Sequence, residues 1–431
     1  MTETAHETVP EITSDERAEH AGTVVMKFGG SSVEGPERIK TVAKRIVAAR
    51  ESGSRVIAVL SAMGNATDEL LELASQVSAT PDPREVDMLI SVGERISCAL
   101  AAMAIKDLGH EAISLTGSQA GIVTDTSHTK AKIVEVRAQR IHEALDDGKI
   151  VLVAGFQGVS TGREITTLGR GGSDTTAVAL AAALGAESCE IFTDVAGVYS
   201  ADPRIIADAY KLPIVTYEEM LEMSASGAKV MALRSVEFAR NHGVRLHVRS
   251  TFSDAEGTWI QEEDEQLLEK AIISGVTHDT SEAKLTIRGV PDRPGVAALV
   301  FRALADAGVN IDMIVQNVSA EGLTDISFTV PKSDLAAAEP ILQAACKEVD
   351  AAGFSQDSDI AKVSLIGAGM RSHPGVAADM FEALADAGIN LEIISTSSIR
   401  ISCVVRAADV ENAVRAVHDR FQLVVEARAN A

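Results

Sequence analysis

A lysine and two glycines follow the first apolar stretch of the chain, in "VMKFGGSS" at residues 25–32. Gly29 and Gly30 let backbone N–H groups approach an anion closely, and the ammonium of Lys27 adds positive charge. A tight turn after an edge strand uses the same residue types, and short glycine motifs often match by chance. This segment alone leaves a phosphate site and a structural turn equally open.

A second glycine-rich segment, "LGRGGSDTTAVALAAALGA", leads into an Ala-rich stretch that predicts a helix. Free N–H groups at a helix N-terminus favour a carboxylate or a phosphate, and Arg170 offers a bidentate fork. We place Ser173 at the N-cap of this helix. A well-capped structural helix is the weaker interpretation, because capping explains neither the three glycines nor the arginine.

Two other segments are ambiguous by themselves. Glu94 and Arg95 begin the apolar helix "SVGERISCALAAMAI", where the carboxylate can bind an ammonium, although an ion pair between these two neighbours is the favoured interpretation. The segment "TDVAGVYSADPR", residues 193–204, either holds a nucleotide or turns a corner. The sequence contains no GxxxxGK[ST] loop and no GxGxxG in a dinucleotide-binding setting.

The elements that must position these residues alternate between strand and helix from residue 24 to about 250. Such alternation predicts a mainly parallel sheet covered by helices on both faces, with ligands at the carboxyl ends of its strands. The expected strands include "VVMKF", "VIAVLS", "AISLTG", "IVLVAG", "CEIFTD" and "VRLHV". Helices are expected near 36–51, 67–77, 84–107, 136–147 and 174–184, with two more between 217 and 241.

The rest of the chain contains a repeat. Residues 293–314 and 373–394 align with 14 identities in 22 positions, and each copy reads strand, helix, strand, strand, helix. The first copy lacks an obvious final strand, which "AIISGV", just before it, can supply by pairing across the copies. In both copies a Pro-Gly turn opens a helix whose free N–H groups can hold the carboxylate of an amino acid.

Composition limits the classes of partner that the chain can bind and indicates the cellular compartment. The chain has 431 residues, with 62 acidic and 39 basic side chains and a net charge of −23, which argues against nucleic-acid and anionic-membrane surfaces. Cys98, Cys189, Cys346 and Cys403 stand alone in apolar stretches, as buried thiols of a reducing cytoplasm do. The apolar runs are shorter than the roughly 18 residues of a membrane span.

Eight segments occur together in one order: "VMKFGGSS", "LSAMGNATDELL", "VGERIS", "TGSQAGIVT", "GFQGVS", "TTLGRGGSDTTAVALA", "TDVAGVYSADPR" and "SASGAKVMALRS". In order and spacing they resemble the aspartate kinases of actinobacterial type, which have the amino-acid kinase fold, a mainly parallel αβα sandwich. The repeat resembles their paired βαββαβ, ferredoxin-like ACT domains. The resemblance implies transfer of the γ-phosphoryl group of ATP, with Mg²⁺, to L-aspartate. A non-catalytic amino-acid sensor and a kinase acting on glutamate are the alternatives.

The resemblance also implies domains and site residues. We expect a disordered acidic tail at 1–23, a catalytic domain at 24–252, a linker at 253–270, and ACT domains at 271–353 and 354–431. Lys27, Asp174 and Lys229 are the implied catalytic residues. The implied substrate-binding residues are Thr67, Glu94, Arg170, Gly171, Gly172 and Ser173. The implied ATP-binding residues are Lys27, Phe28, Gly29, Gly30, Ser61, Ser173, Thr193, Asp194, Tyr199, Asp202, Arg204 and Lys229, with no dedicated metal ligand.

Feedback inhibition by lysine, threonine or both at the ACT domains is implied as well. The implied effector-binding residues are Asp292, Asn310, Ile311, Asp312, Gln316, Val376, Ala377, Asn390, Leu391, Ser397 and Ser398, with Ser319 and Thr324 lining the same region. Family members often have Glu where this chain has Ser398. The resemblance implies a homo-oligomer formed through the ACT domains. A shorter subunit from an internal start needs a codon other than Met, because no Met lies between Met231 and Met313.

Overall fold

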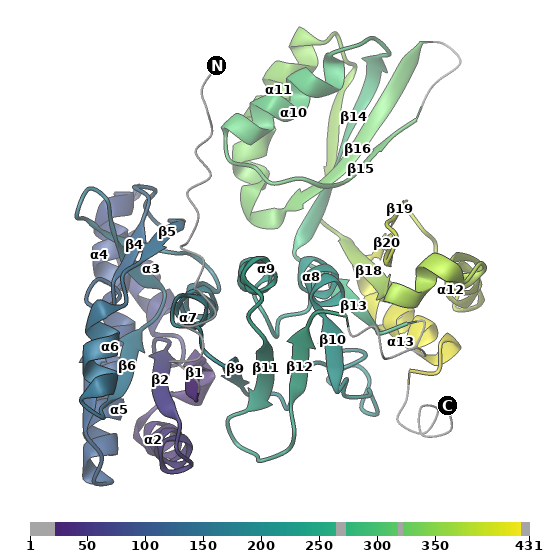
Figure 1. Ribbon diagram of the computed structural model, residues 1–431. Helices are drawn as coiled ribbons and strands as arrows, with labels where there is room; N and C mark the ends of the chain where they lie inside the picture. Colours follow the sequence, from purple (N-terminus) through teal and green to yellow (C-terminus); the bar gives the residue numbers. More distant parts are fainter. Residues whose placement is uncertain (1–21, 264–272, 318–321, 424–431) are drawn as a thin grey trace. The chain divides into compact units, whose positions relative to one another are not determined.

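The computed structural model describes residues 22–263, 273–317 and 322–423. The chain forms two compact units (Figure 1). The first comprises Met1–Val198, Lys211–Ser224 and Lys229–Glu265, and the second comprises Tyr199–Tyr210, Ala225–Ala228 and Gln266–Ala431. The second unit therefore takes two short segments from within the expected catalytic domain.

The first unit is built on an eight-stranded sheet with the order β10-β12-β11-β9-β1-β2-β6-β3 in the described part of the chain. All its pairings are parallel except the one between β11 and β12, so the prediction of a mainly parallel sheet is confirmed. The strands are β1 (Thr23–Phe28), β2 (Arg55–Leu60), β3 (Ala112–Leu115), β6 (Ile150–Ala154), β9 (Ser188–Thr193), β10 (Ile214–Thr216), β11 (Leu246–Ser250) and β12 (Thr258–Gln261).

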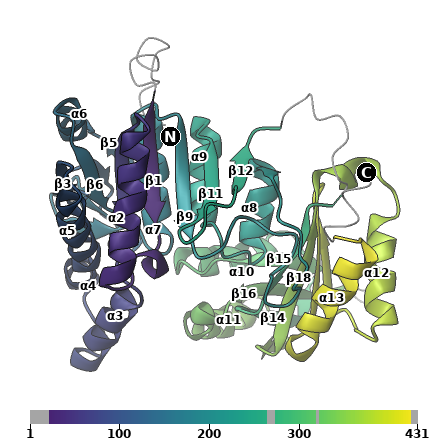
Figure 2. The same cartoon turned by 90° about the horizontal axis from the view of Figure 1, so that it is seen from below.

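Helices cover this sheet. Helices α2 (Pro36–Glu51) and α5 (Val92–Asp107) share one apolar core with β1, β2 and β6, while α7 (Gly172–Ala183) packs on β1, β2 and β9. Figure 2 shows α5 and α6 at the end of the sheet that β3 forms, with β12 and α8 at the opposite end of the unit. The remaining helices are α3 (Ala66–Val77), α4 (Pro83–Ile90), α6 (Gln139–Asp146), α8 (Tyr217–Ala225) and α9 (Leu233–His242).

The single helix expected near 84–107 is divided at Ser91 into α4 and α5. The side-chain amide of Gln157 donates to the Ser91 carbonyl oxygen at 2.6 Å, and this bond comes from a strand 66 residues away. By length and composition residues 83–107 could cross a membrane, but half of that apolar window is buried inside the protein. One face of α5 packs into the core of the first unit through Cys98, Ala101 and Ile105.

A second, smaller sheet of the first unit was not predicted. It has the order β5-β4-β7-β8 and consists of β4 (Ile122–Thr124), β5 (Ile133–Val136), β7 (Gln157–Ser160) and β8 (Ile165–Thr167). These strands have only three or four residues each, which is too short for an apolar periodicity to be recognised.

The second unit contains two antiparallel four-stranded sheets, each covered by two helices, as the repeat predicts. The first sheet has the order β15-β16-β14-β17, and the second has the order β13-β18-β20-β19. The first module consists of β14 (Glu282–Pro291), α10 (Val296–Asp306), β15 (Asp312–Gln316), β16 (Leu323–Pro331), α11 (Leu335–Glu348) and β17 (Gly353–Asp357). The second consists of β18 (Ile360–Ile366), α12 (Val376–Asp386), β19 (Ile393–Thr396), β20 (Arg400–Arg406) and α13 (Val410–Arg420).

The strand before the repeat pairs across the modules, but into the second sheet rather than the first. Strand β13 (Gly275–Asp279) pairs antiparallel with β18, while β17 completes the first sheet by pairing with β14. The boundary expected between residues 353 and 354 falls at the start of β17, and this pairing assigns the strand to the first module. Strand β13 therefore belongs to the sheet of the second module, although it precedes the first module in the chain.

Candidate active site

The carboxyl ends of four central strands lie at the same level of the large sheet. Phe28 is paired with Leu60 on one side and Phe192 on the other, and Leu60 is paired in turn with Ala154. Because the strands are parallel, the segments that follow them begin at one edge. The sheet therefore gathers the turn after β1, the segment from Ser61, the segment from Gly155 and the segment from Thr193 at the place where such sheets bind ligands.

Lys27 projects toward α7. Its neighbours Met26 and Phe28 belong to the core shared with α2 and α5, so strand alternation places Lys27 on the opposite face. There its Nζ lies 2.5 Å from Oδ1 of Asp174 in the first turn of α7, and the two side chains are only 12% and 11% exposed. This ion pair joins the two glycine-rich segments that the sequence singled out.

Packing requires the second glycine after β1. A Cβ on Gly30 would lie 2.9 Å from the Ala62 carbonyl oxygen, so a larger residue there would displace the neighbouring segment. A Cβ on Gly29 would make only an ordinary contact, 3.5 Å from Nζ of Lys27. Phe28 contributes only its backbone to this region, because its ring is buried and stacks on Phe192 with centroids 4.7 Å apart.

The glycine-rich segment before α7 has the backbone conformation of a tight loop. Gly171 is the N-cap, with φ +71°, and a Cβ there would lie 2.1 Å from the Cβ of Ala232. Ser173 was predicted to be the N-cap, and this is wrong: it lies within the first turn, packed against Gly155, and no side chain caps the helix. The Gly172 N–H donates to the Gly169 carbonyl oxygen at 2.9 Å, and no side chain takes the other N–H groups of this turn, which are left for another acceptor. Arg170, just before the loop, is exposed.

Glu94 is buried, with 3% of its surface exposed. Its Oε1 accepts a hydrogen bond from the Ala62 backbone N–H at 3.3 Å, and its Oε2 has no partner in the described structure. Burial raises the pKa of this carboxyl group to about 7. Because the same Ala62 meets Gly30 through its carbonyl oxygen, Glu94 lies one residue away from the phosphate-type turn.

The favoured local ion pair of Glu94 with Arg95 is not formed. The Arg95 guanidinium donates instead to Oε1 of Gln157 at 3.2 Å and to Oγ of Ser91 at 3.2 Å. Successive helical residues point about 100° apart, so the two side chains leave α5 in different directions. A buried carboxylate with an unused oxygen is what an ammonium ligand requires.

Asp87 was missed by sequence reasoning. It is fully buried in α4, and its carboxylate accepts from Nδ1 of His128 at 2.7 Å, from Oγ1 of Thr167 at 2.6 Å and from the backbone N–H of Thr129 at 3.1 Å. These donors belong to two segments next to the glycine loop, since Gly169 packs against Thr129. An aspartate among Val, Met, Leu and Ile was the available signal.

The other predicted residues of the first unit are more exposed. Thr67 is half-buried in the first turn of α3, and Oγ1 of Thr193 donates to the Asp194 carboxylate at 3.0 Å. Lys229 is exposed in the segment between α8 and α9. Ser61 is half-buried, and its N–H donates to the Phe28 carbonyl oxygen at 3.1 Å.

Three predicted ATP-binding residues, Tyr199, Asp202 and Arg204, belong to the second unit. There the Arg204 guanidinium donates to both carboxylate oxygens of Asp202, at 2.7 Å and 3.0 Å. The hydrogen bond from Arg204 lowers the pKa of Asp202. The local structure of "SADPR" is therefore a charged turn stabilised by its own ion pair.

Asp312 of the predicted effector region and its equivalent in the repeat, Glu392, are already paired with lysines. Nζ of Lys362 lies 2.8 Å from Oδ2 of Asp312 and 2.6 Å from Oε1 of Glu282, and Lys284 pairs with Glu392. Lys284 and Lys362 begin the equivalent segments "KLTIRGV" and "KVSLIGA", and Asp312 and Glu392 are equivalent in the repeat. Each module thus provides the lysine that pairs with the acid of the other module.

The remaining effector-region residues lie around this reciprocal pairing. Val376 is buried at the start of α12, Ala377, Ile311 and Leu391 are half-buried, and Asp292, Asn310, Gln316, Asn390, Ser397 and Ser398 are exposed. Thr324 is buried and its hydroxyl donates to the Asn317 carbonyl oxygen. Ser319 lies outside the described residues.

Comparison with known proteins follows the two units. The amino acid kinase family matches residues 22–250, and the ACT domain matches residues 285–345 and again residues 363–421. A parallel sheet with a lysine, an aspartate and glycine loops at the carboxyl ends of its strands, followed by two ACT modules, thus defines an amino-acid kinase with a regulatory region.

Individual relatives show which kind of amino-acid kinase the chain resembles. The aspartokinase of Corynebacterium efficiens is 55% identical over 93% of this chain and 96% of its own length. That of Mycobacterium tuberculosis is 57% identical over the same shares of the two chains. The crystal structure of E. coli aspartokinase III in complex with aspartate and ADP shares the fold, with a TM-score of 0.79 at 24% identity over 92% of this chain and 99% of that one. The chain belongs to the aspartokinase family: it is an ATP-dependent aspartate kinase with regulatory ACT domains.

Proposed function

We propose that the first unit transfers the γ-phosphoryl group of ATP to the side-chain carboxylate of L-aspartate with Lys27 as the central catalytic residue. The observation that carries this assignment is the 2.5 Å contact of Lys27 with Asp174 at an uncapped helix N-terminus. Lys27 and Lys229 neutralise the transferring group, and Asp174 orients Lys27. Ser173 and the backbone at 171–173 bind anionic oxygens, apart from the Gly172 N–H, which donates to the Gly169 carbonyl oxygen at 2.9 Å.

The acceptor needs no general base. An aspartate side chain has a pKa of about 3.9 and is ionised at neutral pH, so the barrier lies in bringing an anion against a polyphosphate. Fixed positive charges and helix N–H groups lower that barrier by electrostatic stabilisation and in-line positioning.

The substrate is held at its two charged ends. Arg170 clamps the α-carboxylate and Glu94 binds the α-ammonium, while Thr67 contacts the side chain. The unpartnered Oε2 of Glu94 supports this role, because an ammonium would remove the penalty of burying the carboxylate.

ATP is bound through the backbone at Phe28, Gly29 and Gly30, and through Ser61. We assign adenosine and ribose contacts to Thr193, Asp194, Tyr199, Asp202 and Arg204. Mg²⁺ binds mainly through phosphate oxygens and water, as this ion usually does. The residues present fit that arrangement, since Asp174 adds one carboxylate beside Lys27. The ion supplies charge neutralisation of the phosphates.

A hydroxylamine trap tests the reaction, since hydroxylamine converts an acyl phosphate into a coloured hydroxamate. With ATP and Mg²⁺, L-aspartate should give hydroxamate, and L-glutamate at the same concentration should give almost none. If L-glutamate gave hydroxamate and L-aspartate did not, the substrate would be glutamate rather than aspartate. Omission of Mg²⁺ in the presence of a chelator should abolish the signal.

The ACT modules are proposed to bind lysine, threonine or both as feedback inhibitors. The Pro-Gly turns before α10 and α12 support this, because Gly295 and Gly375 are N-caps without side-chain hydrogen bonds. Initial rates with lysine, with threonine and with both would identify the effector and reveal concerted action. Rates that none of the three additions changed would contradict the proposal that the ACT modules bind these inhibitors.

We also propose a cytoplasmic enzyme that associates through its ACT domains, with or without a shorter subunit from the same reading frame. The exposed Ile314 and Val315 on the edge strand β15 support association there. A denaturing gel of the purified enzyme, showing one band or two, decides on the shorter subunit.

A further inference from the structure

Residues 199–210 contain three of the residues assigned to adenosine and ribose, but they fold into the core of the second ACT module. One apolar cluster of α12, α13, β13, β18 and β20 also contains Ala201, Ile205, Ile206 and Ala209. Tyr199 packs against the same cluster. The second module therefore determines the local structure of these predicted nucleotide-binding residues.

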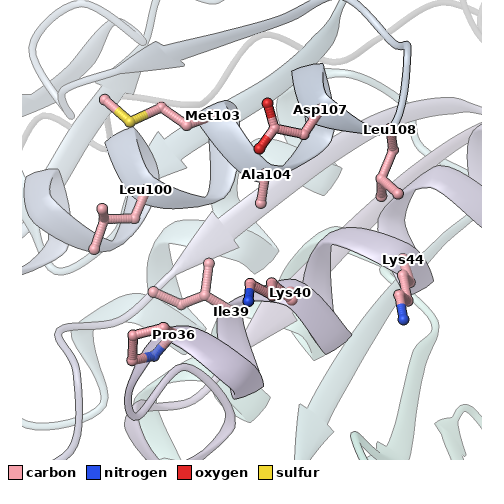
Figure 3. Close-up of a pocket in the computed structure, with 9 residues that line it drawn as sticks. All are labelled: Pro36, Ile39, Lys40, Lys44, Leu100, Met103, Ala104, Asp107 and Leu108. Carbon is pink, nitrogen blue, oxygen red and sulfur yellow. The ribbon is translucent and has the colours of Figure 1, made fainter.

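An apolar groove between α2 and α5 of the first unit contains none of the residues assigned to ATP (Figure 3). Its lining residues include Pro36, Ile39, Leu100 and Met103. The segment with Tyr199, Asp202 and Arg204 is held instead by hydrogen bonds inside the second unit.

Ser200 connects the two ends of this segment to each other and to the rest of the second unit. It is fully buried, and its backbone N–H donates to the Tyr210 carbonyl oxygen at 2.7 Å. Its carbonyl oxygen accepts from the N–H of Val276 in β13 at 2.7 Å. Its hydroxyl accepts from the Tyr210 N–H at 2.8 Å and donates to the Leu423 carbonyl oxygen at 3.0 Å. Each polar atom of Ser200 thus has a partner.

His418 of α13 provides a further donor to Ser200. Its imidazole is fully buried, and Nε2 lies 3.3 Å from the hydroxyl oxygen. Because the hydroxyl gives its one proton to Leu423, Nε2 must carry the proton of this contact. Burial lowers the pKa of His418, although Asp419 and Asp208 act in the opposite direction. The ring is therefore neutral at neutral pH, with its proton on Nε2.

The imidazole has an unfavourable side that only its bond to Ser200 offsets. Nδ1 of His418 is buried and has no hydrogen-bond partner among the described residues, which an apolar side chain of similar volume would avoid. Arg415, three residues earlier on the same helix face, donates to the Ile205 carbonyl oxygen. Helix α13 thus holds the segment at Ser200 and at Ile205, on either side of Asp202 and Arg204.

We propose that His418 is a positioning residue for the nucleotide: through Ser200 it fixes the segment from which Asp202 and Arg204 contact ATP. This inference rests on the proposed assignment of those two residues to adenosine and ribose. His418 itself touches neither substrate. The effect of its loss should therefore fall on the KM for ATP and leave kcat and the KM for aspartate within about twofold.

Steady-state hydroxamate formation by the full-length chain tests the proposal. His418→Leu removes the Nε2 donor and should raise the KM for ATP at least about fivefold, which corresponds to about 1 kcal/mol. His418→Gln keeps an N–H donor on a side chain of similar reach, so its KM should stay within about twofold of the unmodified value. An unchanged KM for ATP in His418→Leu would overturn the proposal.

Leu384→Ala is the matched control for a loss of stability alone. Leu384 is fully buried in the same apolar cluster, but it lies on α12. The variant should lower the midpoint of urea unfolding at least as much as His418→Leu does, and it should leave the KM for ATP unchanged. An equal rise of this KM in both variants would show that general loosening of the module lowers ATP affinity, and the role of His418 would be refuted.

Arg204→Ala separates this proposal from the function on which it rests. Arg204 is 78% exposed, so its truncation should leave the fold intact and raise the KM for ATP at least as much as His418→Leu. A raised KM in Arg204→Ala with an unchanged KM in His418→Leu would keep the nucleotide assignment and refute the role of His418. If neither variant changed the KM, the assignment of this segment to ATP would fail, and the proposal would fail with it.

Discussion

Lys27 and Asp174 form an ion pair of 2.5 Å between the end of strand β1 and the first turn of helix α7, 147 residues later in the chain. The contact is nearly buried, so each charge depends on the other. It places a lysine ammonium beside helix N–H groups, and this combination is what a transferring phosphoryl group requires.

Removal of the ammonium should abolish turnover without unfolding the chain. We expect Lys27→Met to lower kcat at least 100-fold, which corresponds to about 2.7 kcal/mol of transition-state stabilisation. Hydroxamate formation under saturating substrates measures this loss, and thermal unfolding checks the fold. Lys149→Met, at a partly exposed position before β6, is the control and should retain full activity. Retention of kcat in Lys27→Met would refute the catalytic assignment.

The buried carboxylate of Glu94 should lower the free energy of unfolding, although it provides the binding site for the substrate ammonium. Its folded pKa of about 7 lies above the ordinary value of 4.5, so between these pH values the folded state keeps a proton that the unfolded state has lost. The free energy of unfolding therefore falls as pH rises through this window, by about 3 kcal/mol in total. Below pH 4.5 the two states are equally protonated.

Glu94→Gln removes this penalty. The variant should be more stable than the unmodified chain at pH 8, by up to about 3 kcal/mol, and nearly equal to it at about pH 4.5. Urea unfolding at both pH values measures the difference. Its KM for aspartate should rise at least tenfold, since the ammonium loses its carboxylate. A variant that is less stable at pH 8, or that binds aspartate normally, contradicts the assignment.

Asp87 should be a positioning residue for the glycine loop. Asp87→Asn presents an amide N–H₂ to groups that all donate, and leaving buried donors unsatisfied costs about 1–3 kcal/mol. We expect a lower midpoint of urea unfolding together with a higher KM for aspartate, because the segments beside Gly169 are no longer held. Thr167→Val removes one donor and keeps the carboxylate, so both effects should be smaller. Loss of stability with an unchanged KM would leave Asp87 a purely structural role.

The two reciprocal ion pairs of the ACT modules should contribute unequally to the free energy of unfolding. Lys362 is 1% exposed, and Lys362→Met leaves two acids without their cation, the nearly buried Glu282 and the 38% exposed Asp312, at a cost of about 3 kcal/mol. Lys284→Met is milder, about 1 kcal/mol, because Glu392 still accepts from Arg406 at 2.7 Å. Denaturant unfolding of both variants, followed by lysine and threonine inhibition curves, measures the asymmetry. Equal destabilisation would show that the two lysine–acid pairs are equivalent.

Local sequence was sufficient for most strands of the large sheet, for the repeat and for the two glycine-rich segments of the site. Alternating strands and helices predicted the mainly parallel sheet, and the repeat predicted the two antiparallel modules. The turn after Lys27 and the loop at Gly171 were found because glycines at a strand end and before a helix have a local conformational reason. The positive φ of Gly171 and its contact with Ala232 agree with that reason.

Contacts between distant residues were decided by the tertiary structure. Arg95 was expected to bind its neighbour Glu94, but Gln157, 62 residues away, takes the guanidinium and leaves the carboxylate free for a ligand. Strand β13 joins the second module rather than the first, and the equivalent lysines of the repeat exchange partners. Sequence periodicity reports which face of an element is buried. It does not report which of several suitable partners will be nearest to a side chain. That choice is made when the sheets form and bring distant parts of the chain together.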